Sequence, residues 1–344
     1  MVRHPVEKFT KFRAVMYAHA TARILKYTMA VITVVTLHFI LIRMMPGDPL
    51  VGLLGTRNYY SLLSLDPEAL KAAGAEYGLD RPIHVQYAKH MGRLLRGDLG
   101  HTPYYGKPVL EVILFRMKWT LILLVPAVIL STVLGGSLGA LAGWETNSKT
   151  DRLLTATFLF LQAMPGYCMG LILVLILSFH AGLFPLSGMA GEGSEGATRI
   201  GDLIRHTVLP IAALVLHGSA TPYIVMRSVV RQSAGENYVL TAIALGLTGR
   251  RVLFRHIVPN VLPTLITTVA LECGHMVGGV LLVETVFSWQ GMGTLIYDAV
   301  VSRDYPLLSG CLLFLTIGVI AANALADLAC TFIDPRVRDG MSHG

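Results

Sequence analysis

The chain is 344 residues long, with 53% hydrophobic residues, 14% charged residues and a mean hydropathy of +0.60. A soluble domain carries about 25% charged residues, so this composition excludes an ordinary soluble protein and indicates an integral membrane protein. The net charge of +7 is better explained by basic loops that orient membrane spans than by nucleic-acid binding. No CxxC spacing indicates a disulfide framework or a zinc site among Cys168, Cys273, Cys311 and Cys330.

Six stretches are long and apolar enough to cross a bilayer, which takes about 20 mostly apolar residues. They predict an all-α integral membrane protein with six transmembrane helices. The first follows a basic leader, 1–23, and is expected to be a retained span because it lacks a small-x-small cleavage site. Packed neighbours are expected to accommodate Pro126, Pro165, Pro210 and Pro222 within or near spans. The predicted spans are 24–44, 119–143, 153–180, 204–226, 262–287 and 306–332.

Basic residues gather in alternate connecting segments. The N-terminal region carries six Lys or Arg residues against Glu7, and the segment 227–261 carries five arginines against Glu236. The loop 181–203 is acidic instead. Because cytoplasmic loops carry an excess of Lys and Arg, we expect the leader, the segment 227–261 and the tail 333–344 to be cytoplasmic.

The outer loop 45–118 is the one long connection within the permease domain 24–332. It contains helical sequence, DPEALKAAGAEYGL, and the turn signals PGDP and GDLG. The stretch GHTPYYGKP resembles a phosphate loop only superficially. A Walker A motif needs Gly-x-x-x-x-Gly-Lys followed by Ser or Thr, whereas Lys107 is followed by Pro108. The sequence therefore indicates no ATP site in this chain.

The stretch ENYVLTAIALGLTGRRVLFRHIVPNVLP, 236–263, is too basic to cross a bilayer and too apolar for a simple linker. Apolar or small residues recur at helical spacing, which predicts an amphipathic helix of about three turns that ends or bends at Gly246 and Gly249. The small residues Ala242, Ala244 and Gly246 leave a shallow surface that another protein backbone could approach. The alternative is a helix that lies on lipid headgroups with its arginines against anionic lipid.

This stretch resembles the cytoplasmic EAA loop of permease subunits of bacterial ATP-binding cassette (ABC) importers, Glu-Ala-Ala-x3-Gly-x9-Ile-x-Leu-Pro. The Ala, Gly and Pro spacing is intact, but Leu240 replaces the leading Glu and His256 replaces the Ile. The peptide and nickel permease version, Tyr-Val-x-Thr-Ala-x-Ala-x-Gly-Leu, is matched in full from Tyr238 to Leu247. The positions to which the resemblance gives an ATPase-coupling role are Tyr238, Thr241, Ala242, Ala244, Gly246, Leu247, Arg250 and Pro259.

The resemblance extends along most of the chain. PGDP, YGLDRPIHVQY, GDLG, ETVFSWQGMG, RDYP and DPR occur in the family's order. The chain is most similar to the dipeptide/oligopeptide permease "B" subunits, whose family also includes nickel and glutathione importers. The resemblance implies a type I ABC importer permease fold in a bacterial or archaeal cytoplasmic membrane, with short peptides as the first substrate choice and nickel, another metal chelate or glutathione as alternatives.

The same resemblance implies partners. A second homologous permease subunit, two cassette ATPase subunits and an extracytoplasmic binding protein would complete the importer within membrane lipid. ATP and Mg would be bound by the ATPases, so no cofactor, metal site, catalytic residue or nucleic-acid partner is expected for this chain.

Span five contains LECGHM, in which Glu272, His275 and Met276 share one helix face. Ionisable residues inside a membrane are costly, so these three are candidate pore-lining residues. The alternatives are a paired carboxylate at a helix–helix contact and, less favoured, a transient metal site, because one helix cannot complete a coordination shell.

Two other classes fit less well. A secondary transporter would carry charged residues in several spans, whereas this chain offers mainly Glu272. An intramembrane hydrolase would need a nucleophile and a base on facing helices, and neither Ser131 nor Ser178 lies in a G-x-S-x-G motif.

Overall fold

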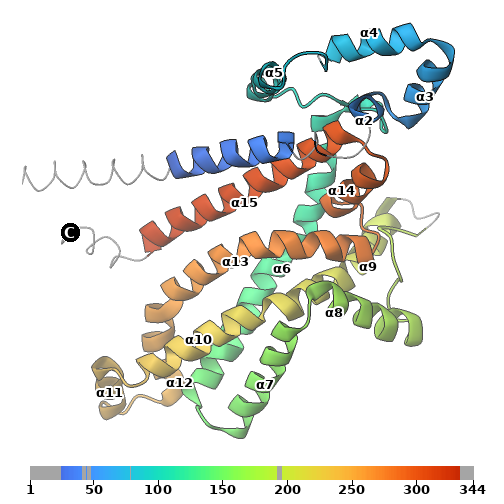
Figure 1. Cartoon of the computed structure of the whole chain (residues 1–344). Coiled ribbons are helices and arrows are strands. Elements are labelled where there is room, and N and C mark those ends of the chain that lie inside the picture. Colours follow the sequence, from blue (N-terminus) through green and yellow to red (C-terminus); the bar gives the residue numbers. More distant parts are fainter. Residues whose placement is uncertain (1–24, 41–43, 45–47, 78, 192–195, 334–344) are drawn as a thin grey trace, which may run out of the picture. The chain divides into compact units, whose positions relative to one another are not determined.

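The computed structural model of the chain describes residues 25–40, 44, 48–77, 79–191 and 196–333. Helices make up most of this part of the chain, and its strands form one short hairpin (Figure 1). The chain divides into two compact units, and the first is built around 121–289. The second unit combines 23–120 with 290–318. The predicted all-α fold is therefore confirmed.

Four of the described helices are long and apolar enough to cross a membrane: Val109–Trp144, Arg199–Ser233, Gly249–Val286 and Tyr305–Ala324. A bent pair, Lys149–Ala163 and Gly166–His180, is a fifth if it is one span. The predicted span 24–44 is described as a shorter apolar helix, Leu25–Ile40, and otherwise lies outside the described residues. The structure thus supports four or five spans, and the count of six stays a prediction.

The first unit contains most of the long helices. After α6, Val109–Trp144, which the two units share, come α7, Lys149–Ala163, and α8, Gly166–Leu173, with its π-helical extension η1, Val174–His180. The remaining elements are α9 (Gly196–Gly218), α10 (Ala220–Ser233), α11 (Asn237–Ala244), α12 (Gly249–Val252), the π-helical turn η2 (Leu253–Ile257) and α13 (Val258–Val286).

The predicted span 153–180 is broken, with an angle of 102° between α7 and α8. Pro165 causes the break: it has no N–H to donate, and it disfavours helical geometry in the residue before it. Met164 is accordingly extended, with φ −93° and ψ 128°. Its carbonyl accepts a hydrogen bond from His217 Nδ1 at 2.9 Å instead. Pro126 and Pro210, by contrast, stay inside α6 and α9.

Helices α6 and α10 are packed backbone to backbone along three glycines of α6, a contact that we call the glycine seam. A Cβ atom on Gly139 would lie 2.4 Å from the carbonyl oxygen of Tyr223. Small residues spaced by four allow such close approach, which drives helix association in membranes. The three contacts join Gly135 to Ser219, Gly139 to Tyr223 and Gly143 to Arg227.

The second unit holds the region predicted as an outer loop. The short helices α2, Pro49–Leu54, and α3, Thr56–Leu65, are followed by α4, Pro67–Tyr77, and α5, Ile83–Leu95. Asp48 caps α2 by accepting the Leu50 N–H at 2.9 Å. The predicted helical sequence is α4, and the predicted GDLG turn is confirmed by Gly97 and Gly100 at φ +75° and +84°. Residues 109–118 belong to α6 rather than to a loop.

A short hairpin, with two residues in each strand, follows α5 and is hydrogen-bonded to the C-terminal part of the same unit. Strands β1, His101–Thr102, and β2, Lys107–Pro108, pair antiparallel. The turn between α14, Met292–Val301, and α15, Tyr305–Ile333, contains the buried Asp304. Its carboxylate accepts hydrogen bonds from the Thr102 hydroxyl, the Leu307 N–H at 3.0 Å and the Tyr104 N–H at 3.3 Å. The hairpin is thereby fixed to a segment some 200 residues away in sequence.

Candidate functional site

The predicted amphipathic helix is α11, and a glycine ends it. It has eight residues, about two turns rather than three. Gly246 adopts φ +79°. Its N–H bonds to the Ile243 carbonyl at 2.9 Å, and the Leu247 N–H bonds to the Ala242 carbonyl at 3.3 Å. This pair of bonds is a Schellman motif, whose left-handed position favours glycine. The predicted termination at Gly246 is therefore confirmed, and its cause is backbone conformation.

One face of α11 is packed on the chain itself. Val239 and Ala242 are buried in a core cluster with residues of α6, α10, α12, η2 and α13. Leu247, just after the Schellman glycine, packs on the same cluster. Ala242 is only 5% exposed, so it does not contribute to the outward surface that the sequence suggested. Its small side chain instead lies within this core beside α11.

The outward surface of α11 is apolar. Tyr238, Leu240, Ile243 and Leu245 are all exposed, and Leu245 is 77% exposed. Ala244 and Gly246 are exposed among them, and Thr241 is exposed with its hydroxyl bonded to the Asn237 carbonyl at 2.9 Å. An apolar cluster of this kind on a surface indicates an interaction site. We call this outward surface the coupling face, after the role that the resemblance implies for it; its residues are Tyr238, Leu240, Thr241, Ile243, Ala244, Leu245 and Gly246.

Basic residues follow this face along the chain. They lie at the start of a continuous helical run, Gly249–Val286, which consists of α12, η2 and α13. Pro259 therefore lies inside this run rather than after a loop. Pro259 is in the first turn of α13, where a missing N–H is tolerated, and the preceding turn is π-helical. A shallow hollow of about 510 Å³ is lined by Thr248, Arg250, Arg251, Phe254, Arg255 and Pro259.

Two further contacts join elements of the first unit, and sequence reasoning missed both. Gly249 lies against the Trp144 ring, so that an added Cβ would be 3.2 Å from the indole. Arg227, in the middle of α10, donates to both oxygens of Asp151 at 2.6 and 2.9 Å. Ser148 and Asp151 have the spacing of a helix start, and the Ser148 hydroxyl does accept the Asp151 N–H at 2.9 Å. The spacing of Ser148 and Asp151 thus predicts a helix start, but it does not predict that Asp151 pairs with an arginine 76 residues away.

The candidate pore-lining residues lie on α13, in the predicted span, and only one of them is exposed. Glu272 and Met276 are partly buried, whereas His275 is exposed. The Met276 methyl packs toward α9, where a Cβ on Gly218 would be 2.9 Å away. Another carboxylate in the same helix, Glu284, is fully buried although sequence reasoning did not single it out. Among the described residues, no group of three His, Cys, Asp or Glu side chains is placed to hold a metal ion.

Comparison with known families gives the class of protein. Residues 135–339 match the family described as "binding-protein-dependent transport system inner membrane component". This match covers more than half of the chain, which therefore belongs to that family. Its members are permease subunits of ABC importers, and ATP is hydrolysed by separate subunits. Such importers work with ATPase subunits and a substrate-binding protein.

Individual relatives match over nearly their whole length. The chain is 32% identical over 327 residues to the oligopeptide transport system permease protein AppB of Bacillus subtilis (strain 168), covering 94% of this chain and 99% of AppB. It is 31% identical over 328 residues to the dipeptide transport system permease protein DppB of Escherichia coli (strain K12), covering 89% and 94%.

A solved structure shares the fold. The MetNI methionine ABC transporter, in an inward-facing conformation, matches with a TM-score of 0.53 at 15% identity, covering 65% of this chain and 97% of that one. At this identity the match shows the fold alone. The expected type I ABC importer permease fold is confirmed.

Proposed function

We propose that this chain is a permease subunit that forms half of the pathway through which short peptides are imported. The observation that carries the proposal is the near full-length similarity to permeases named for oligopeptides and dipeptides. A third relative, at 32% identity, is a di/tripeptide transport system permease protein of Pseudomonas aeruginosa (strain UCBPP-PA14). A second homologous permease subunit would supply the other half of the pathway.

The coupling face is proposed to dock into a groove on a cassette ATPase. Its exposed apolar residues, of which Leu245 is 77% exposed, support this role. The arginines beside it would add charge complementarity and orient the docking. On the opposite side, α11 is held to the spans through Val239 and Ala242, so displacement of the ATPase would be passed to the spans. Two ATPase subunits, binding ATP and Mg, and one extracytoplasmic binding protein would complete the complex.

The proposed topology places both termini and the coupling face in the cytoplasm and 45–118 outside. The basic residues of the leader and of 227–261 support this orientation. The Trp144–Gly249 contact supports it too, because it brings the end of α6, where the 144–152 turn begins, against the start of α12, which follows α11. Within the bundle, the face of α13 that carries Glu272 and the exposed His275 is proposed to line the pathway beside the second permease subunit.

Uptake by the reconstituted complex tests the substrate. Proteoliposomes holding this chain with its second permease, its ATPases and its binding protein should import labelled di- and oligopeptides only with ATP inside. Excess unlabelled peptide should compete, whereas excess nickel should not. ATP-driven nickel uptake that peptides leave unchanged would replace the peptide assignment with the metal one.

Cysteine labelling tests the topology in a cysteine-free background. Ser61, exposed in α3, and Gln232, exposed at the end of α10, are replaced one at a time by Cys. A membrane-impermeant maleimide should label the first in intact cells and the second only after permeabilisation. The reverse pattern would overturn the proposed orientation.

A further inference from the structure

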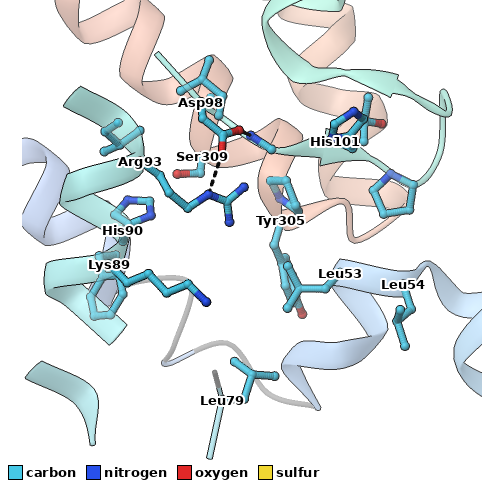
Figure 2. Close-up of a pocket in the computed structure, with 18 of the residues that line it drawn as sticks. Leu53, Leu54, Leu79, Lys89, His90, Arg93, Asp98, His101, Tyr305 and Ser309 are labelled. Atoms are coloured by element: carbon cyan, nitrogen blue, oxygen red, sulfur yellow. Dashed lines mark hydrogen bonds and ion pairs between the residues drawn. The ribbon is translucent and has the colours of Figure 1, made fainter. Parts of the chain in front are cut away.

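The second unit contains a cavity that the proposed importer function does not use. Its volume is about 690 Å³, within the range of small-molecule sites. It is a partly open cavity, lined by the end of helix Leu25–Ile40, by α2 and α5, by the hairpin and by the start of α15. Sequence segments from Phe39 to Gly310 therefore contribute to one site. Figure 2 shows the side chains around it.

One wall of the cavity is cationic. Lys89 and Arg93 are one helical turn apart on α5, and both side chains extend toward Tyr305 (Figure 2). The described lining contains one carboxylate, Asp98, which accepts a bond from Arg93 Nε at 2.8 Å. That carboxylate also accepts the Gly100 N–H at 2.9 Å. Two permanent cations and one carboxylate therefore line this wall of the cavity.

The bonding of Arg93 leaves part of its guanidinium available. The group has five N–H donors in a planar fork, and the bond to Asp98 uses the Nε donor. The Nη2 atom would lie 3.3 Å from a Cβ added to Gly100, so the guanidinium extends along the lining backbone. A second anion could thus be bound beside Asp98, with Lys89 as its other charged contact.

The remaining lining is mixed, and its apolar part is aromatic and aliphatic. Phe39 contributes a ring that lies 5.5 Å from the His90 ring and 5.3 Å from the Tyr87 ring. Leu53 and Leu54 come from α2. Tyr305 packs so closely on α2 that a Cβ on Gly52 would lie 2.1 Å from its ring. The cavity thus joins a cationic wall to fixed aromatic and aliphatic walls.

We propose that this cavity binds a small anionic amphiphile, a ligand that carries a carboxylate or a phosphate on an apolar body. Lys89 and the free edge of Arg93 would hold the anion, and Phe39, Leu53 and Tyr305 would contact the body. Two sources have this chemistry: a short peptide with a free C-terminus and an anionic phospholipid. The proposal does not depend on peptide transport, because binding is measured directly.

Binding to the importer complex without its binding protein, in phosphatidylcholine nanodiscs, tests the proposal. Each anionic probe is paired with a twin that lacks its net negative charge: N-acetyl-trileucine with N-acetyl-trileucine amide, and short-chain phosphatidylglycerol with zwitterionic short-chain phosphatidylcholine. The dissociation constants are measured for the wild type and three variants. Lys89→Gln removes a lining cation. Asp98→Asn removes the lining carboxylate but keeps an oxygen to accept the Gly100 N–H. Lys71→Gln removes a lysine of α4 that does not line the cavity.

The wild type should prefer at least one anionic probe over its twin by about tenfold, as expected for a charge-assisted contact. Lys89→Gln should abolish that preference, Asp98→Asn should increase it, and Lys71→Gln should leave it unchanged. The probe that shows this pattern identifies the source. The absence of any preference in the wild type would overturn the proposal, as would a preference that both cavity variants leave intact. If Lys89→Gln does not fold, the direction of the Asp98→Asn effect still decides. Loss of peptide uptake in the transport assay would leave this result unaffected.

Discussion

Arg227 and Asp151 connect the middle of α10 to the first turn of α7 through two hydrogen bonds between one guanidinium and one carboxylate. The Asp151 side chain is 1% exposed and that of Arg227 is 24% exposed. The carboxylate also accepts the Asn147 N–H at 3.0 Å. The pair is therefore a buried junction at the end of the first unit that carries α11.

Breaking this pair should destabilise the protein strongly. Arg227→Gln leaves a buried carboxylate without its cation, and removal of one partner of a buried pair costs about 3–5 kcal/mol. We expect an unfolding free energy lower by about 3 kcal/mol, measured by denaturant titration of the purified complex. The double variant Asp151→Asn with Arg227→Gln should recover part of the loss. Lys107→Gln, which breaks an exposed pair with Glu111, should change stability by less than about 1 kcal/mol. Equal effects of the buried and exposed variants would contradict this account.

The glycine seam should not accept even one methyl group. In Gly139→Ala the new Cβ would meet the Tyr223 carbonyl oxygen at 2.4 Å, so α6 and α10 must separate. Overpacking of this kind costs about 1–3 kcal/mol. The melting temperature and the detergent-extracted yield should both fall. Gly92→Ala is the matched control, since an added Cβ there meets nothing within 4 Å on helix α5 and should stabilise by up to about 1 kcal/mol. A melting temperature for Gly139→Ala at or above the wild-type value would refute the seam.

The coupling face should fail when it becomes charged. Leu245→Asp changes a side chain that is 77% exposed, so the fold should be retained. Docking would bury the new carboxylate, and an uncompensated buried charge costs about 3–5 kcal/mol. We expect an inserted subunit that loses its ATPase on co-purification. Leu65→Asp, at an 82% exposed position of α3, should keep it. Full ATPase retention by Leu245→Asp would exclude the coupling face. Gly246→Arg is a poorer test because φ +79° would strain any side chain at that position.

Removing the Thr102 hydroxyl, one of three donors to the Asp304 carboxylate, should lower the stability of the protein in a pH-dependent way. Burial raises the pKa of the Asp304 carboxyl, while the bonds from Thr102, Leu307 and Tyr104 lower it. Because the net shift is upward from 3.8, folded-state stability falls as pH rises from that value through the folded-state pKa. Thr102→Val removes a donor to the ionised form and should raise the pKa further. We expect a loss of about 1–3 kcal/mol that is larger at about pH 8 than at about pH 5.

Thermal unfolding of the purified complex at the two pH values measures this effect. Thr56→Val, at an exposed position at the start of α3, is the control and should show little change at either pH. A Thr102→Val loss that is the same at both pH values would show that the Asp304 charge is not involved.

Local sequence signals predicted local structure well. The helical spacing around Val239 and Ala242 and the glycine at Gly246 were enough to place α11 and its end. The sequence did not predict its length or its inward face, because Leu245 forms the C-cap and Ala242 lies in a cluster with residues of five other elements. Membrane hydropathy likewise predicted four long apolar helices that the structure contains, but not the break at Pro165, whose effect depends on an alternative partner for the Met164 carbonyl.

The missed features all depend on contacts between distant segments. Asp151 and Arg227 are 76 residues apart, and each alone reads as an ordinary loop charge. The cavity in the second unit combines Lys89 and Arg93 with Tyr305, which lies more than 200 residues further along the chain. Neither association has a spacing rule that a single sequence could reveal.

The glycine seam also limits which motions the first unit can make. Sliding α10 along α6 would move each glycine away from the carbonyl that it faces and bring bulkier neighbours into that contact. The two helices should therefore shift together as one rigid body. Since α10 leads through residues 234–236 to α11, a displacement of α11 would reach α6 along the whole seam instead of being lost as slippage between helices. Stiffness in this helix pair, rather than flexibility, is then what would carry motion from one end of the unit to the other.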